Sequence, residues 1–118
     1  MSARGPITTH VLDVSLGRPA AGIAVSLAIW DERENAYREL GAAETDSDGR
    51  APQLLAPGTP ISPGRYRISF AVAPYLERTA GRGFYPHVDI TFLVSSTAEH
   101  YHVPLLLSPF GYSTYRGS

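Results

Sequence analysis

Glycine and proline interrupt this sequence so often that long helices are disfavoured. Ten prolines and eleven glycines are spread over 118 residues, and both residue types end or bend regular helices. The segments between them are short and rich in Val, Ile, Thr, Tyr and Phe, which is typical of β-strands. We therefore expect an all-β protein, and its length fits one domain spanning residues 1–118.

Alternation of apolar residues places the expected strands. From Ile23 to Ile29, for example, every second residue is a large aliphatic one, as in a strand with one buried face. A short helix is predicted at 74–80, because Pro74 suits a first turn and Gly81 suits the position after the end. Strands are predicted at 7–15, 23–30, 37–45, 65–73, 88–94, 101–107 and 112–115, with a weaker one at 53–56. Seven or eight strands with one short helix predict a two-sheet β-sandwich.

Composition excludes several classes of protein. The formal net charge is −1, with ten basic and eleven acidic side chains, so a generally basic nucleic-acid binder is excluded. All basic residues are arginines and cysteine is absent, which excludes lysine Schiff bases, thiol catalysis, thiolate zinc sites and disulfides. No apolar run approaches the roughly 20 residues that cross a membrane, and the first residues lack a signal peptide's apolar stretch. We expect a cytoplasmic protein with no membrane or nucleic-acid partner.

Four histidines are candidates for chemistry, because imidazole titrates near neutral pH. His10 lies in the middle of the first predicted strand, on the face that carries Thr8. His100 and His102 are two residues apart, so they share a face if their strand begins early enough. From spacing alone, His10 is interpreted as a surface histidine and His87 as structural or exposed. A solvated or hydrogen-bonded pair is favoured for His100 and His102 over a metal site, since no third ligand is evident.

A single arginine follows the most turn-like segment of the chain. Residues 46–49 read Asp-Ser-Asp-Gly, in which Asp and Ser bond the nearby backbone and Gly accepts a positive φ. The guanidinium of Arg50, which comes next, could face solvent or hold an anionic substrate. The two Asp residues resemble half of a calcium loop, but no Glu follows at the required distance, so turn formation explains them better. No Gly-x-Ser-x-Gly motif is present, which disfavours a serine hydrolase.

Sequence motifs at both ends of the chain indicate a function more specifically than the spacing of single histidines and arginines does. Residues 9–13 read Thr-His-Val-Leu-Asp, and residues 107–118 read Leu-Ser-Pro-Phe-Gly-Tyr-Ser-Thr-Tyr-Arg-Gly-Ser. Between them lie, in order, Gly17-x-Pro19-Ala20, Thr45-Asp46-x-x-Gly49-Arg50, Gly64-x-Tyr66 and Phe84-Tyr85-Pro86. The set resembles the transthyretin-related family, whose members are 5-hydroxyisourate hydrolases of purine breakdown. The terminal Tyr-Arg-Gly-Ser is the most specific element, because it is absent from the hormone-carrying transthyretins.

This resemblance implies a transthyretin-like sandwich that assembles into a homotetramer, with active sites lining a central channel. The implied reaction is hydrolysis of 5-hydroxyisourate to 2-oxo-4-hydroxy-4-carboxy-5-ureidoimidazoline, with no cofactor and no metal. Carried over residue by residue, the catalytic residues are His10, Arg50, His102 and Ser118, and the substrate-binding residues are His10, Arg50 and Tyr115.

The residue types suit these implied roles. Hydrolysis needs an activated water and stabilisation of an oxyanion. The two histidines are expected to deprotonate water and return a proton to the leaving nitrogen, without spacing deciding which is the base. Arg50 is expected to hold the developing negative charge. Tyr115 would contact the substrate through its backbone or hydroxyl, and Ser118 would contribute its hydroxyl or terminal carboxylate.

Two alternatives and one structural expectation accompany this interpretation. A non-catalytic carrier would bind a small aromatic ligand in the same channel, but such a channel calls for apolar and lysine groups where this chain has His10 and Arg50. An accessory sandwich module of a larger protein is the weaker alternative.

Arg116 has the opposite parity to Tyr115, so we expect it to brace the last strand from the other side, against a carboxylate.

Overall fold

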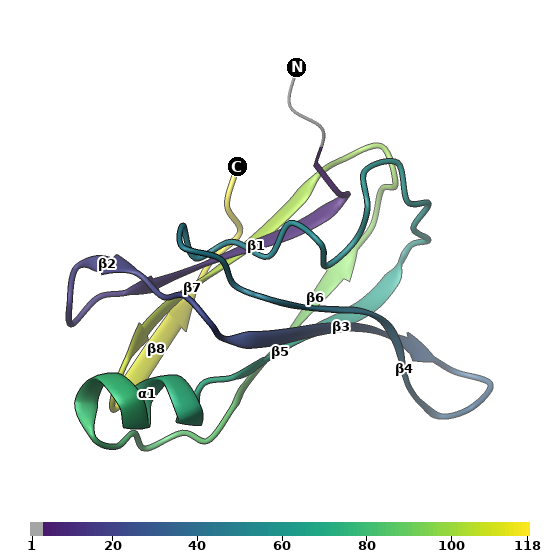
Figure 1. The fold of residues 1–118 in the computed structure, drawn as a ribbon. Coiled ribbons are helices and arrows are strands. Elements are labelled where there is room, and N and C mark those ends of the chain that lie inside the picture. Colours follow the sequence, from purple (N-terminus) through teal and green to yellow (C-terminus); the bar gives the residue numbers. More distant parts are fainter. Residues whose placement is uncertain (1–3) are drawn as a thin grey trace.

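The computed structural model describes residues 4–118, which form two four-stranded sheets packed against each other (Figure 1). The first sheet has the order β2–β1–β7–β8 and the second the order β4–β3–β5–β6. The elements are β1 (Ile7–Asp13), β2 (Arg18–Pro19), β3 (Ala24–Asp31), β4 (Ala36–Glu44), β5 (Gly64–Ala71), α1 (Ala73–Ala80), β6 (Val88–Val94), β7 (Tyr101–Ser108) and β8 (Gly111–Thr114). The predicted two-sheet β-sandwich with one short helix is confirmed.

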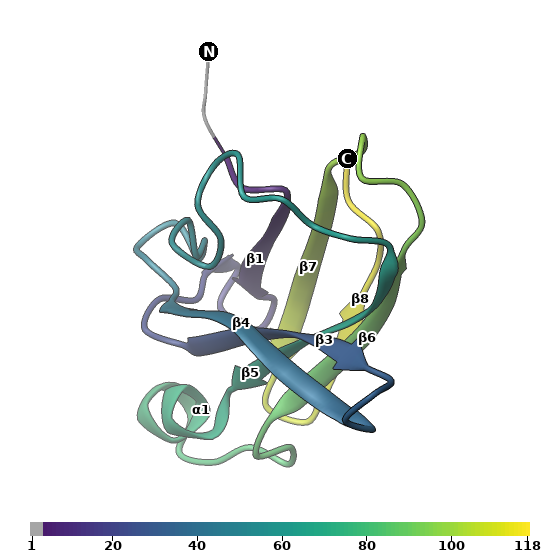
Figure 2. The same cartoon turned by 90° about the vertical axis from the view of Figure 1, so that its right-hand side faces the viewer.

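Alternation along the strands decides which side chains enter the sandwich. In β1 every second residue from Ile7 to Asp13 is buried, whereas Thr8, His10 and Leu12 between them are only partly covered. β3 and β5 alternate in the same way. The inward apolar side chains of both sheets join one hydrophobic core, as Figure 2 shows by the two layers that enclose it. The outer face of the first sheet therefore presents Thr8 and His10.

β1 and β7 lie side by side at the centre of the first sheet and run parallel, while the other strand pairs among residues 4–118 are antiparallel. The pairing extends from Ile7 beside Tyr101 to Asp13 beside Leu107. In this register Thr8 lies beside His102. Paired residues of neighbouring strands project from the same face of a sheet, so His102 joins the outward side chains of β1.

Helix α1 closes one end of the sandwich. It has Pro in its first turn and is followed by Gly81, whose φ of 83° is left-handed, as the sequence predicts. The buried Tyr75 hydroxyl donates to Asp13 Oδ2 at 2.6 Å. Burial raises the pKa of Asp13, but hydrogen bonds from Tyr75, Ser15 and Leu16 outweigh it, and the net pKa is lowered. Burial and Asp13 raise the pKa of Tyr75 to about 12, so a charged hydrogen bond ties the end of β1 to the helix.

The strand predicted at 53–56 is wrong. These residues form a turn-rich loop, in which Leu54 and Leu55 are buried in the hydrophobic core. The loop backbone approaches β4 so closely that a Cβ at Gly41 would lie 2.0 Å from the Leu54 carbonyl oxygen. The two leucines thus fill the core from a loop, and a short apolar run does not separate this case from a buried strand.

The two-residue strand β2 is not among the strands predicted from the sequence. Its residues Arg18 and Pro19 pair with Asp13 and Leu12 of β1. The remaining predicted boundaries agree with the structure to within one or two residues, and those of β6 agree fully. No helix in the described part of the chain has the length and apolar character that a membrane span requires.

Candidate active site

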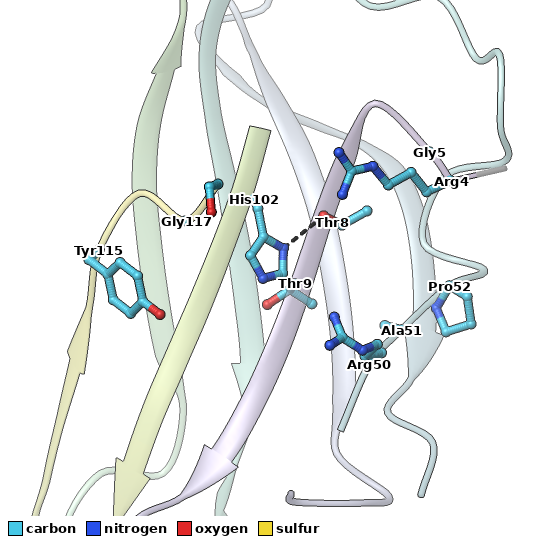
Figure 3. Close-up of a pocket in the computed structure, with 11 residues that line it drawn as sticks. Arg4, Gly5, Thr8, Thr9, Arg50, Ala51, Pro52, His102, Tyr115 and Gly117 are labelled. Carbon is cyan, nitrogen blue, oxygen red and sulfur yellow. Dashed lines mark hydrogen bonds between the residues drawn. The ribbon is translucent and has the colours of Figure 1, made fainter. Parts of the chain in front are cut away.

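A cavity of about 650 Å³ opens on the outer face of the first sheet (Figure 3). Small-molecule sites commonly have volumes of roughly 300–1,000 Å³, so this cavity suits a small ligand. Its walls come from the segment before β1, from β1 and β7, from the loop after the 46–49 turn and from the end of the chain. The lining residues are Arg4, Gly5, Thr8, Thr9, Arg50, Ala51, Pro52, His102, Tyr115, Gly117 and Ser118.

The hydroxyl of Thr8 joins two histidines at this cavity. Thr8 Oγ1 lies 2.8 Å from His102 Nδ1 and 2.9 Å from His100 Nε2, and Figure 3 shows the first contact as a dashed line. Of the two predicted states, solvated or hydrogen-bonded, the structure shows the hydrogen-bonded one, with Thr8 as the shared partner. Between residues 4 and 118 no group of three His, Cys, Asp or Glu side chains is arranged to hold a metal ion.

His10 projects from the same face as Thr8, two residues further along β1, and is partly buried. It does not line the cavity, but it lies near enough to act on His102. After burial and Arg50, the charge of His10 contributes to the lowered pKa of His102. The structure thus places His10 beside the cavity rather than in its wall.

Arg50 is held against β1 by the turn that precedes it. Asp46 Oδ1 accepts hydrogen bonds from the backbone N–H of Asp48 at 2.9 Å and of Arg50 at 3.0 Å, which confirms the predicted turn. Gly49 has a φ of 76°, and its carbonyl accepts from Val11 N at 2.8 Å. A Cβ at Gly49 would lie 2.4 Å from the Val11 carbonyl oxygen. Only glycine allows this approach, which carries Arg50 to the cavity.

The end of the chain folds back onto β7. Gly117 N donates to the His102 carbonyl at 2.8 Å, and a Cβ at Gly117 would lie 2.5 Å from His102 Cδ2. This close contact places Tyr115 and Ser118 in the cavity wall. Figure 3 shows the Tyr115 ring on the side of His102 opposite to Arg50.

Arg116 turns to the other side of the chain from Tyr115. Its guanidinium donates to Glu99 Oε1 at 2.9 Å and lies 4.6 Å from the centroid of the Tyr101 ring. The predicted carboxylate partner of Arg116 is confirmed. This contact anchors the terminal segment beside the start of β7.

Both histidines that contact Thr8 have lowered pKa values. Burial is the main cause for His102, followed by the positive charges of Arg50, His10, His100 and Arg4. Burial and Arg4 lower the pKa of His100, against an opposing hydrogen bond to the Gly5 backbone. Since an unperturbed imidazole titrates near 6.5, both rings are predominantly neutral at pH 7 and have a lone pair available to accept a proton.

Sequence reasoning did not single out Arg4 or Thr8 as site residues. The shared parity of Thr8 with His10 was visible, but its contact with His102 depends on the register between β1 and β7. Arg4 precedes the first strand, where no periodicity indicates its direction. The remaining missed wall residues are Gly5, Thr9, Ala51 and Pro52, whereas Gly117 belongs to the terminal tetrapeptide that the family resemblance implies as part of the site.

A family model described as the HIUase/Transthyretin family matches residues 7–117. The chain belongs to this family. The match confirms the resemblance indicated by the terminal motifs, and it covers all eight strands of the fold.

Individual members of the family are similar along most of the chain. A mouse (Mus musculus) 5-hydroxyisourate hydrolase is 42% identical over 113 residues, which cover 96% of this chain and 95% of the mouse protein. The Arabidopsis thaliana "Uric acid degradation bifunctional protein TTL" is 45% identical over 127 residues, and the match covers 98% of this chain. The chain spans only 38% of that longer relative. The structure of Klebsiella pneumoniae 5-hydroxyisourate hydrolase superposes with a TM-score of 0.78 at 32% identity, covering 95% of this chain and 98% of that one.

We expect His100 and His102 to titrate in the folded protein with midpoints below 6.5, because burial and the neighbouring cations disfavour imidazolium. NMR of the histidine Cε1–H groups between about pH 5 and 8 measures both midpoints. The unfolded chain then binds more protons than the folded one in the window below 6.5, so stability should fall as the pH drops through it. Arg50→Met should move the His102 midpoint upward. Wild-type midpoints at or above 6.5 would contradict the expectation.

Proposed function

We propose that this chain hydrolyses 5-hydroxyisourate to 2-oxo-4-hydroxy-4-carboxy-5-ureidoimidazoline, a step of urate degradation. Similarity to 5-hydroxyisourate hydrolases along nearly the whole chain supports hydrolysis over the carrier alternative. The observation that carries the proposal is the cavity in which the neutral imidazole of His102 lies among the guanidinium groups of Arg4 and Arg50. A planar, oxygen-rich purine derivative matches that combination of charge and size.

His102 is suited to act as the general base, since its lowered pKa leaves it neutral at pH 7. It takes a proton from a water molecule as the water oxygen bonds to a ring carbonyl carbon of the substrate. The carbonyl oxygen becomes an oxyanion. When the oxyanion collapses, the ring C–N bond breaks and the proton passes from the histidine to the leaving nitrogen. The base is thereby restored, and the ring has opened by addition of one water.

Arg50 and Arg4 are suited to bind the substrate and to stabilise the oxyanion. Both side chains line the cavity, and Figure 3 shows both extending toward the side where His102 lies. A guanidinium offers paired N–H donors in a plane, which match the carbonyl oxygens of a planar ring. Such donors stabilise the transition state most where charge develops.

His10, Tyr115 and Ser118 complete the proposed site. His10, beside the cavity, is suited to assist proton movement near His102. Tyr115 and Ser118 also line the cavity, where the Tyr115 ring can contact the substrate and the Ser118 hydroxyl or terminal carboxylate can accept or orient a hydrogen bond. We further propose that residues 1–118 act as one domain, since the buried apolar residues of the described range 4–118 form a single core.

The decisive assay follows the loss of ultraviolet absorbance of freshly generated 5-hydroxyisourate with and without the protein. In this assay His10→Asn and His102→Asn should each lower turnover by about a hundredfold or more, the usual scale for an acid–base group. Thermal stability should change little, because both side chains point outward from the sheet. His87→Asn is the matched control, since His87 is exposed and contacts Asp89 at 3.7 Å. A wild-type protein with no effect on the absorbance would refute the proposed function.

Removal of residues 115–118 should abolish most turnover while leaving the fold intact. The four residues are exposed or half-buried, so few core contacts are lost, but two cavity-lining side chains and the Gly117 contact with His102 disappear. Circular dichroism checks the fold and the ultraviolet assay checks turnover. Full activity in the shortened chain would show that the terminal tetrapeptide has no part in the mechanism.

We propose a homotetramer, as the family resemblance implies. Strands β8 and β6 are edge strands of their sheets, and open edges favour pairing between subunits. Exposed apolar side chains occur near them, including Leu93, Phe110 and Tyr112. Multi-angle light scattering should report four chains per particle, with turnover falling on dilution only as the tetramer dissociates. A fully active monomer would refute this assembly.

A further inference from the structure

The Thr8 hydroxyl contacts two ring nitrogens but carries one hydrogen. It lies 2.9 Å from His100 Nε2 and 2.8 Å from His102 Nδ1. Because a hydroxyl donates one hydrogen bond and can accept two, at most one histidine accepts from Thr8, and a histidine that does not accept must donate to it. When one histidine accepts, the three groups form a directed chain of hydrogen bonds. Its direction decides which nitrogen of His102 carries the proton.

The backbone of Gly5 selects the direction of this chain. The hydrogen bond between His100 and the Gly5 backbone favours the charged form of His100, so in this bond a ring N–H donates and the Gly5 carbonyl accepts. Tyr101 N donates to the Pro6 carbonyl at 3.0 Å, and this contact holds the segment before β1 beside His100. Since His100 Nε2 already faces Thr8, the N–H that reaches Gly5 is that of Nδ1.

The rest of the chain follows from the single N–H of a neutral imidazole. With its proton on Nδ1, His100 accepts the Thr8 hydroxyl hydrogen at Nε2. The Thr8 oxygen then accepts a hydrogen bond from His102, whose proton must lie on Nδ1. The remaining nitrogen of His102, Nε2, carries a free lone pair.

We propose that Thr8 and His100 are positioning residues that hold His102 as the Nδ1–H tautomer, so that Nε2 is the general base. The catalytic meaning of this inference rests on the proposed hydrolysis, whereas the tautomer itself does not. In a hydrogen-bonded histidine the partner of one nitrogen decides the state of the other. Here the acceptor for the His102 N–H is the Thr8 hydroxyl, which His100 orients. In other proteins this acceptor is often a carboxylate or a backbone carbonyl.

The contact with Gly117 fixes the orientation of the same ring. Cδ2 of His102, which is bonded to Nε2, would lie 2.5 Å from a Cβ at Gly117, so the terminal segment packs directly against this edge. Figure 3 shows the second ring nitrogen on the side of the ring away from Thr8. Thr8 on one edge and Gly117 on the other therefore restrict rotation of the ring.

The chemical step keeps this arrangement. A water proton passes to His102 Nε2 as the water oxygen bonds to the substrate carbonyl carbon, and Nδ1–H continues to donate to Thr8. The imidazolium returns the Nε2 proton to the leaving nitrogen when the C–N bond breaks. With the other tautomer Nε2 would already be protonated, and this first transfer could not occur.

The tautomer can be read directly, without substrate, from ¹⁵N chemical shifts and long-range ¹H–¹⁵N correlations of histidine-labelled protein above the His102 midpoint. We expect a protonated Nδ1 and a bare Nε2 at His102 in the wild type. Thr8→Val keeps the side-chain shape without the hydroxyl and should allow the Nε2–H form to appear, whereas Thr8→Ser should restore the wild-type spectrum. A wild-type His102 protonated at Nε2 would overturn the proposal, whatever the activity of the protein.

Turnover supplies the second measurement. Thr8→Val and His100→Phe should each lower kcat by about tenfold or more, as part of the contribution of an acid–base group, with KM nearly unchanged and with Thr8→Ser close to wild type. Thermal melts confirm that each variant is folded. Unchanged kcat in both folded variants would overturn the positioning role. A wild type that shows the expected tautomer but no hydrolysis would instead refute only the proposed function.

Discussion

The parallel pairing of β1 with β7 is the interaction on which the candidate site depends. It sets Thr8 beside His102, and it turns His10 and His102 to the same outer face. The other two parts of the site are attached to these strands by isolated β-bridges, Arg50 to His10 and Gly117 to His102. A shift of this register by one residue would turn the side chains of one strand into the core, and the cavity would lose Thr8 or His102.

Two glycines allow the backbone to come close enough for this attachment. Gly49 lies against the Val11 carbonyl and Gly117 against the His102 ring, at distances that no Cβ could occupy. Gly49 directly precedes Arg50, which has a proposed chemical role. Gly117 lies between Tyr115 and Ser118, which also have proposed roles. The motifs Thr-Asp-x-x-Gly-Arg and Tyr-Arg-Gly-Ser thus have a steric basis, because glycine permits the contact and its neighbours use it.

The arginine side chains of the cavity lie beside imidazole rings, and this arrangement has two electrostatic consequences. Arg50 and Arg4 lower the pKa of His102 in addition to burial, and the same guanidinium groups are available to an electron-rich substrate. One arrangement therefore keeps the base unprotonated and stabilises negative charge in the transition state. Arg116 instead pairs with Glu99.

Local pattern in the sequence was enough to predict most strands, the helix between Pro74 and Gly81 and the outward direction of His10 and His102, because alternation and capping depend only on neighbouring residues. Family motifs added the set of proposed site residues. Three features depended on contacts between distant segments. The apolar run at 53–56 fills the core as a loop, since a short apolar run suits either a strand or a buried loop. Arg4 joins the cavity because the segment before β1 lies beside β7. The hydrogen bonds of Thr8 to both histidines exist only because parallel pairing brings residues 8 and 102 together, and no pattern within either strand specifies its partner or its register.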